Sequence, residues 1–198
     1  MGARGTGRHV AEQTEHERWQ SRVRTLRALL RAAEAEVGTT SVTLVGLSLR
    51  AGERVYVEVD GGLVELRNRG RRASWRAVQA GTVTVTSQRI VFSGRTRREW
   101  AYDALTEVVH ASPCRTVLAV TDRPTASGVD YDGATAERTR VLIDVAIADS
   151  RGRRADVVRD LRDRLADHVR REPRDDGPVS RNLMTEPSSV CNGRHVHG

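Results

Sequence analysis

The stretch GTVTVTSQRIVFSG, from Gly81 to Gly94, decides how this chain is interpreted. Val83 and Val85 alternate with three threonines, which is the period of two expected for a β-strand with one buried face. After Ser87-Gln88 the run from Arg89 to Ser93 is apolar enough to return as a second strand. The stretch therefore predicts a hairpin inside a β-sheet.

The same period extends on both sides, from residue 52 to about residue 148. Val55, Val57 and Val59 alternate with polar residues, and the run Asp60-Gly61-Gly62 predicts a hairpin turn into a strand over 63–67. A loop rich in Asp, Gly, Pro and Ser covers 122–137, long enough to be a lid or slack chain. Further strands are predicted over residues 74–79, 82–86, 89–93, 99–102, 105–110, 115–121 and 141–147.

Helices are predicted on either side of this β region. Apolar residues spaced by four and three place one stripe on a helix over 10–37, and a similar pattern predicts a second helix over 153–171. Residues 1–9 and 172–198 lack apolar periodicity, so we expect a disordered arm and a disordered tail. The members of the first stripe are Trp19, Val23, Leu26, Leu30, Ala33 and Val37.

Many short strands followed by an amphipathic helix predict a mainly β domain over 52–171, a small antiparallel barrel or sandwich whose open end the helix covers. The stretch 81–94, together with EWAYDAL from Glu99 to Leu105, resembles the bacterial PH-like and GRAM-type domains of actinobacterial proteins. The resemblance implies a PH-like antiparallel barrel of about seven strands, capped by the helix at 153–171. The N-terminal helix and the 122–137 loop depart from its simplest form.

The charge of the chain is concentrated in one region. All 33 basic residues are Arg and the formal net charge is +7. Between Gly61 and Arg98 there are nine Arg and one acid, so this region holds the whole basic excess.

No apolar run approaches the ~20 residues that span a bilayer, and the first residues resemble no signal peptide, so we expect a cytoplasmic protein.

The resemblance implies that Arg residues in hairpin loops hold phosphoinositide or other anionic head groups. On this basis we expect a non-catalytic binding module that associates peripherally with the inner face of the membrane. Trp75 would sit beside the basic residues at the interface. The opposing interpretation is that exposed turns gather Arg without any ligand and that Trp75 fills the core. The candidate anion-binding residues are Arg71, Arg72, Arg76, Arg95, Arg97 and Arg98.

Two other kinds of partner remain open. A protein-interaction scaffold would use a sheet edge or the stripe of Trp19, Val23, Leu26 and Leu30, and residues 19–37 could also join two copies of the chain. Nucleic acid is a lesser alternative, because clustered Arg also binds its phosphates but no recognised motif accompanies the cluster. An exposed stripe would favour the scaffold, and convergence of the six Arg would favour an anion site.

Catalytic and metal-binding patterns are weak. The sequence has no G-x-S-x-G, G-x-x-x-x-G-K-[ST] or H-E-x-x-H motif. Glu107, His110 and Cys114 lie in strand-like sequence, where such spacing does not place them on one face. Cys191, His195 and His197 lack a fourth ligand for a structural zinc site. We therefore expect no enzyme activity, no metal and no cofactor.

Overall fold

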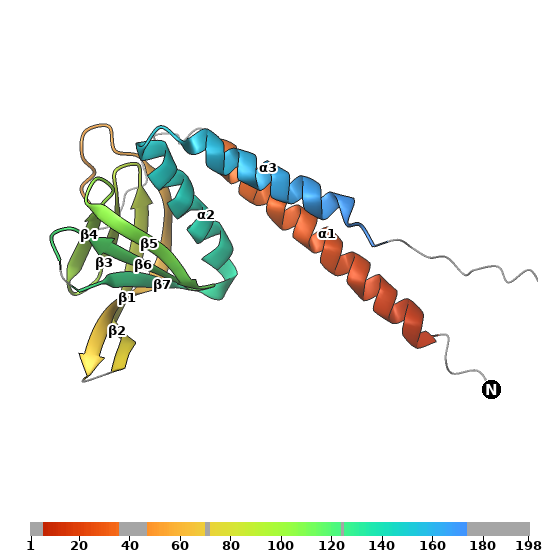
Figure 1. Cartoon of the computed structure of the whole chain (residues 1–198), viewed down its shortest axis with the longest axis horizontal. Helices are drawn as coiled ribbons and strands as arrows, with labels where there is room; N and C mark the ends of the chain where they lie inside the picture. Colours follow the sequence, from red (N-terminus) through yellow and green to blue (C-terminus); the bar gives the residue numbers. More distant parts are fainter. Residues whose placement is uncertain (1–5, 36–46, 70–71, 124, 174–198) are drawn as a thin grey trace, which may run out of the picture.

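The alternating stretch at Thr82–Thr86 lies inside the sheet, with Val83 and Val85 fully buried. The computed structural model describes residues 6–35, 47–69, 72–123 and 125–173. In these ranges seven antiparallel strands form one sheet in the order β4-β3-β2-β1-β7-β6-β5. The sheet curls into a half-barrel (Figure 1). The strands are β1 (Val55–Arg69), β2 (Arg72–Thr86), β3 (Arg89–Ser93), β4 (Arg97–Ala101), β5 (Leu105–Ser112), β6 (Arg115–Val120) and β7 (Ser127–Tyr131). The expected fold class, mainly β with about seven antiparallel strands, is confirmed.

The predicted turn at Asp60-Gly61-Gly62 is wrong. β1 runs straight through it, and β2 likewise joins the two strands predicted over 74–79 and 82–86. Gly61 and Gly81 stand opposite each other in register. A Cβ on Gly61 would lie 2.4 Å from the carbonyl oxygen of Asp130, and one on Gly81 would lie 2.2 Å from that of Ser93. Glycine is needed here because the backbones approach closely, not because the chain turns.

The segment over 122–147 also differs from its prediction. Part of the predicted loop forms β7, which pairs with β1 and β6. The predicted strand over 141–147 belongs instead to helix α2, Gly133–Ser150. This helix buries eight residues on several sides, so the segment over 141–147 is apolar except for Asp144, and periodicity cannot distinguish such a segment from a buried strand.

The predicted helices at both ends are present. Helix α1 spans Thr6–Glu34, so it begins inside the segment 1–9 that was predicted to be disordered. Helix α3 spans Arg154–Arg170, as the pattern over 153–171 predicts. Val37 and almost all of the predicted tail 172–198 lie outside the described residues.

The helix that covers the sheet is α2 rather than α3. Ala136, Ile143 and Ala146 of α2 join the hydrophobic core formed by the strands. Helix α3 instead packs beside α1 and α2 in a second cluster that contains Leu26, Val145 and Leu161. Helices α1 and α3 lie side by side and project away from the sheet as a stalk (Figure 1).

Candidate functional site

The tip of the β1–β2 hairpin extends beyond the sheet. β7 pairs with β1 only from Gly61 to Glu65, and β3 pairs with β2 only from Thr82 to Val85. β1 and β2 continue to pair with each other as far as Arg69 and Arg72. We call this two-stranded projection, residues 66–69 and 72–75, the arm; it points away from the body of the sheet (Figure 1).

Three of the predicted anion-binding residues of the first turn, Arg72, Trp75 and Arg76, lie on or beside the arm. Arg72 pairs with Arg69 near its tip, and Trp75 stands opposite Leu66 at its root with a half-buried side chain. Arg76 follows at the junction with the sheet and is exposed. Arg71 lies outside the described residues.

The second predicted turn packs close to the root of the arm. Gln79 of β2 accepts a hydrogen bond from the backbone N–H of Thr96 at 3.3 Å, which holds the β3–β4 turn against β2. Arg95 in this turn is exposed. Arg97 forms an ion pair with Glu99 at 2.7 Å, and Arg98 forms one with Glu65 at 2.9 Å. The structure therefore brings Arg98 to the root of the arm and turns Arg97 toward Glu99.

A pocket of about 470 Å³ lies where these segments meet. Arg67 of β1, Arg98 of β4 and Arg123 of the β6–β7 connection line it, together with Glu65 and Ser127. Three guanidinium groups and one carboxylate therefore line the pocket, which gives its lining a net formal charge of +2. We call this site the basic pocket.

Glu65 orients two of the three guanidinium groups. It accepts hydrogen bonds from Nη2 of Arg98 at 2.9 Å and from Nη2 of Arg67 at 3.4 Å. Each guanidinium has five N–H donors, so both retain donors that Glu65 does not use. The pair is partly accessible to water, with the Arg98 side chain 33% exposed.

Arg123 is the member of the pocket that sequence reasoning missed. Its Nη2 donates to the backbone carbonyl of Glu99 at 3.1 Å, which ties the β6–β7 connection to edge strand β4. Its Nη1 is buried and has no hydrogen-bond partner among the described residues. A buried donor without a partner is costly, so this atom marks a place where an acceptor would be favourable. In the sequence it is one Arg in a predicted loop, and nothing there distinguishes it.

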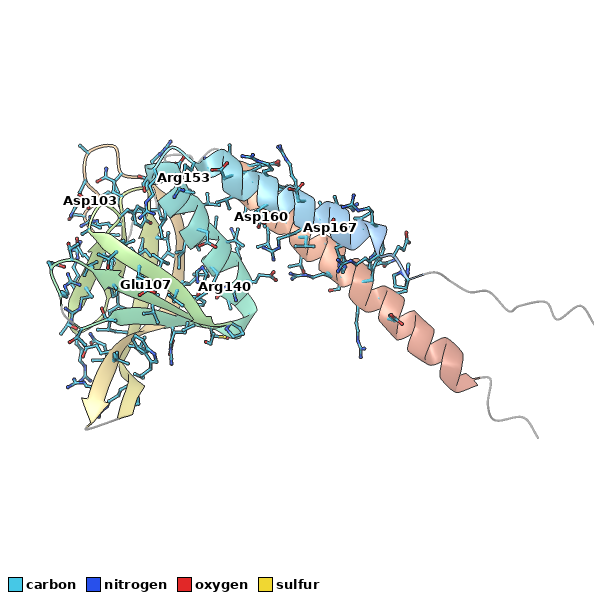
Figure 2. The ribbon with its side chains drawn as sticks, in the orientation of Figure 1. Asp103, Glu107, Arg140, Arg153, Asp160 and Asp167 are labelled. Atoms are coloured by element: carbon cyan, nitrogen blue, oxygen red, sulfur yellow. The ribbon has the colours of Figure 1, made fainter. Side chains whose placement is uncertain are left out.

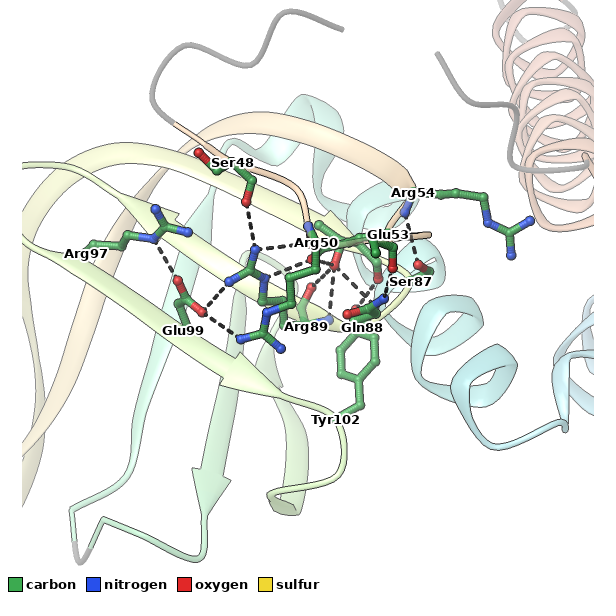
Figure 3. A network of polar contacts seen from close by, with 12 residues as sticks. Ser48, Arg50, Glu53, Arg54, Ser87, Gln88, Arg89, Arg97, Glu99 and Tyr102 are labelled. Carbon is green, nitrogen blue, oxygen red and sulfur yellow. Dashed lines mark hydrogen bonds and ion pairs between the residues drawn. The ribbon is translucent and has the colours of Figure 1, made fainter. Parts of the chain in front are cut away.

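Arg89 belongs to the Arg-rich region between Gly61 and Arg98, but its side chain is held in a buried network of ion pairs and hydrogen bonds (Figure 3). Its side chain is 4% exposed, and its Nε and Nη2 donate to the two carboxylate oxygens of Glu53 at 2.8 and 2.9 Å. Its Nη1 donates to Glu99 at 2.5 Å. Burial alone would raise the pKa of Glu53, but hydrogen bonds from Arg89, from the backbone of Arg50 and from Thr86 outweigh it and lower that pKa. This network fastens residues 48–53 to β3 and leaves Arg89 unavailable to a ligand.

The stripe on α1 is covered by the chain itself. Val23 is 5% and Leu26 is 2% exposed, and Leu30 is half-buried. Trp19 donates from its indole nitrogen to the carbonyl oxygen of His168 on α3 at 3.0 Å and stacks on that histidine. The stripe is therefore not an exposed surface, and of the two surfaces named for a protein-interaction scaffold only the sheet edge is still a candidate.

The weak catalytic and metal-binding patterns gain no support. The ring nitrogens of His110 contact Thr116 at 2.8 Å and Asp144 at 3.1 Å, so neither is directed at the thiol of Cys114. Cys191, His195 and His197 lie outside the described residues.

Comparison with known proteins does not assign a family. No family model matches the sequence. No curated protein matches it either. One solved structure, the C-terminal domain of an unknown protein from Leishmania infantum, aligns with 50% of this chain and 85% of its own at 10% identity, with a TM-score of 0.33. None of the helices in the described ranges is both long and apolar enough to cross a bilayer.

Proposed function

We propose that the protein binds anionic phospholipid head groups without catalysing a reaction, and that it does so with the basic pocket and the arm. The observation that carries this proposal is the convergence of Arg67, Arg98 and Arg123 from three separate segments on one pocket, where the buried Nη1 of Arg123 has no hydrogen-bond partner in the described part of the chain. Guanidinium groups bind phosphate through charge-assisted and often bidentate hydrogen bonds, so a phosphate is a suitable occupant.

The arm adds a second contact with a charged surface. The side chain of Arg67 is 60% exposed, and the sequence continues with three more basic residues, Arg69, Arg71 and Arg72. Each basic residue near an anionic leaflet contributes about 1 kcal/mol, so a few together support weak, reversible adsorption. The half-buried Trp75 at the root of the arm would lie near the head groups, where an indole is favourable. On this proposal the protein works in the cytoplasm, at the inner face of the membrane.

Nucleic acid is a second candidate, favoured by the shape of the arm. A two-stranded β-ribbon fits the major groove of DNA, and Arg at its tip would contact phosphates. We prefer phospholipid because three guanidinium groups line a pocket at the root of the arm, where a head-group phosphate could enter, whereas a duplex would contact the ribbon along its length.

Flotation with vesicles tests the proposal. We expect the full chain to float with phosphatidylserine-containing vesicles at low salt, to stay behind with phosphatidylcholine vesicles, and to be released as salt rises because screening shortens the reach of each charge. Duplex DNA is added as a competitor. If the protein stays in the unbound fraction at low salt but shifts the DNA in a gel, nucleic acid replaces lipid as the ligand.

A further inference from the structure

The two edge strands of the sheet, β4 and β5, differ in whether another part of the protein contacts their outer side. At the β4 edge, the carbonyl of Glu99 accepts a hydrogen bond from Arg123. β5 forms the opposite edge and, in the described part of the chain, pairs only with β6. Its outer side therefore presents the N–H and C=O groups of an edge strand, which can accept a further strand. Irregularities in its register at Leu105/Glu107 and Val109/Ser112 leave Glu107, Val108 and Val109 in regular pairing between them.

A groove of about 530 Å³ runs beside this edge, between β5, the C-terminal half of α2 and the first turns of α3. Its apolar lining comes from Leu105, Val108, Ile147 and Val157. The volume lies in the range of about 300–1,000 Å³ that is usual for ligand clefts. An extended segment paired with β5 would therefore contact the apolar side chains of the groove along one of its sides.

The charge around the groove is opposite to that of the basic pocket. Four carboxylates line it, from Glu107 on β5, Asp144 on α2, and Asp156 and Asp160 on α3, against two guanidinium groups, Arg151 and Arg153. The three aspartates are already within ion-pair distance of other side chains of the protein, which are His110, Arg159 and Arg164. Figure 2 labels Glu107 on β5 and Asp160 on α3. Glu107 has no ion-pair partner among the residues that the structure describes, so its charge is available to a ligand.

We infer that the β5 edge and this groove bind an extended basic peptide of a partner protein, which adds a strand to the sheet. Alternate side chains of a strand point to opposite sides, so apolar residues would lie against Val108 and Ile147 while Arg or Lys lies beside Glu107. A second copy of this chain fits less well, because its own β5 contains Glu107 and no Arg or Lys that could lie beside the Glu107 of the first copy.

The test uses the full chain, without vesicles, and a short fluorescein-labelled peptide in which arginine alternates with valine, followed by fluorescence anisotropy. We expect saturable binding that Glu107→Arg weakens about tenfold, because like charges then face each other. Asp163→Arg is the matched control: it makes the same change of charge on an exposed residue of α3 outside the groove, and binding should be unchanged. A peptide methylated on its backbone nitrogens keeps its charge but cannot pair as a strand, and we expect it not to bind.

Three results would overturn the inference. The methylated peptide could bind as well as the parent peptide, which would mean that no strand is added. Glu107→Arg could behave like Asp163→Arg, which would place binding elsewhere. Sedimentation could show a dimer that Glu107→Arg dissociates, which would make a second copy the occupant of the edge. Arg67→Glu, which removes a charge from the basic pocket, should leave peptide binding intact, so failure here is separable from failure of lipid binding.

Discussion

Arg98 of β4 donates from Nη2 to Oε1 of Glu65 on β1 at 2.9 Å, although the two residues are 33 positions apart in the chain. This contact joins the β3–β4 turn to the root of the arm. It also places a negative charge in the lining of the basic pocket, so Glu65 both orients Arg98 and opposes the binding of an anion.

Replacement of the Glu65 carboxylate by a neutral amide should strengthen binding to anionic vesicles. Glu65→Gln keeps the size of the side chain and removes the charge, which frees Arg67 and Arg98 for phosphate. A gain of about 1 kcal/mol, the contribution of one charge at an anionic surface, corresponds to roughly fivefold tighter binding to phosphatidylserine vesicles. Vesicle titration followed by the fluorescence of the protein measures this gain. Unchanged or weaker binding would mean that the pocket does not hold the head group.

The buried pair of Glu53 and Arg89 should be a main source of stability. Glu53→Gln removes the fully buried partner of Arg89 and leaves only the partly exposed Glu99 to balance its charge, and breaking a buried pair costs about 3–5 kcal/mol. Urea unfolding followed by circular dichroism measures the loss. Asp163→Asn, on the exposed surface of α3, is the control and should change stability by no more than a few tenths of a kcal/mol. Equal losses in the two variants would contradict the role of this network.

The same network predicts the response to acid. The pKa values of Glu53 and Glu99 are lowered in the folded chain relative to their ordinary value of 4.5. Each group therefore contributes stability above about pH 4.5, and that contribution is lost as the pH falls through its folded pKa. The free energy of unfolding should decrease below about pH 4.5, with a shallower decrease in Glu53→Gln. A pH series of urea melts would contradict this if the two slopes were the same.

The glycines in the centre of β1 and β2 should differ sharply in their tolerance of alanine. At Gly81 a Cβ would lie 2.2 Å from the carbonyl oxygen of Ser93 and 2.7 Å from the ring of Phe92, so the strands must move apart. We expect Gly81→Ala to lower stability by about 1–3 kcal/mol or more. Gly62→Ala is the matched control, since its nearest neighbour would be 3.5 Å away. Thermal unfolding of the two variants decides whether close approach is the reason for the glycine.

The stripe on α1 should act in folding rather than in self-association. Leu26 is 2% exposed and packs in the cluster shared with α2 and α3, so Leu26→Ala should cost about 2–5 kcal/mol. We expect the molecular mass in sedimentation to be the same for wild type and variant at equal concentration. A dimer in the wild type that Leu26→Ala converts to a monomer would restore the interpretation of the stripe as an interface.

The pattern of α3 was predictable because one side of this helix faces solvent, which gives a clean period of 3.6. The alternation of threonine and valine at Thr82–Thr86 also predicted a strand, although Thr84 and Thr86 are buried together with Val83 and Val85. Helix α2 was not predictable, because Val141 to Ile147 is buried on several sides and loses its period. The turn predicted at Gly61-Gly62 failed because a glycine needed for close approach looks the same in sequence as a glycine needed for a turn.

The candidate site was predictable only in part, for a related reason. A surplus of Arg over acid marks the region 61–98 in the sequence, and Arg98 does line the basic pocket. The sequence does not show which Arg side chains form ion pairs within the protein and so are not available to a ligand. Arg89 pairs with Glu53, and Arg97 pairs with Glu99. Arg123 is positioned by a backbone carbonyl on another strand, and no residue pattern reports such a contact.

Flotation of Arg123→Ala with phosphatidylserine vesicles at low salt, beside Arg170→Ala, tests the central claim most directly. Arg170 is 73% exposed on the stalk, so its loss changes the net charge equally without touching the basic pocket. Both variants are first shown to unfold at the wild-type temperature. We predict that Arg123→Ala lowers the apparent affinity by about 10- to 100-fold, the range for loss of a charge-assisted hydrogen bond, while Arg170→Ala floats like the wild type. Equal flotation of the two variants would show that the basic pocket is not where the protein meets the membrane.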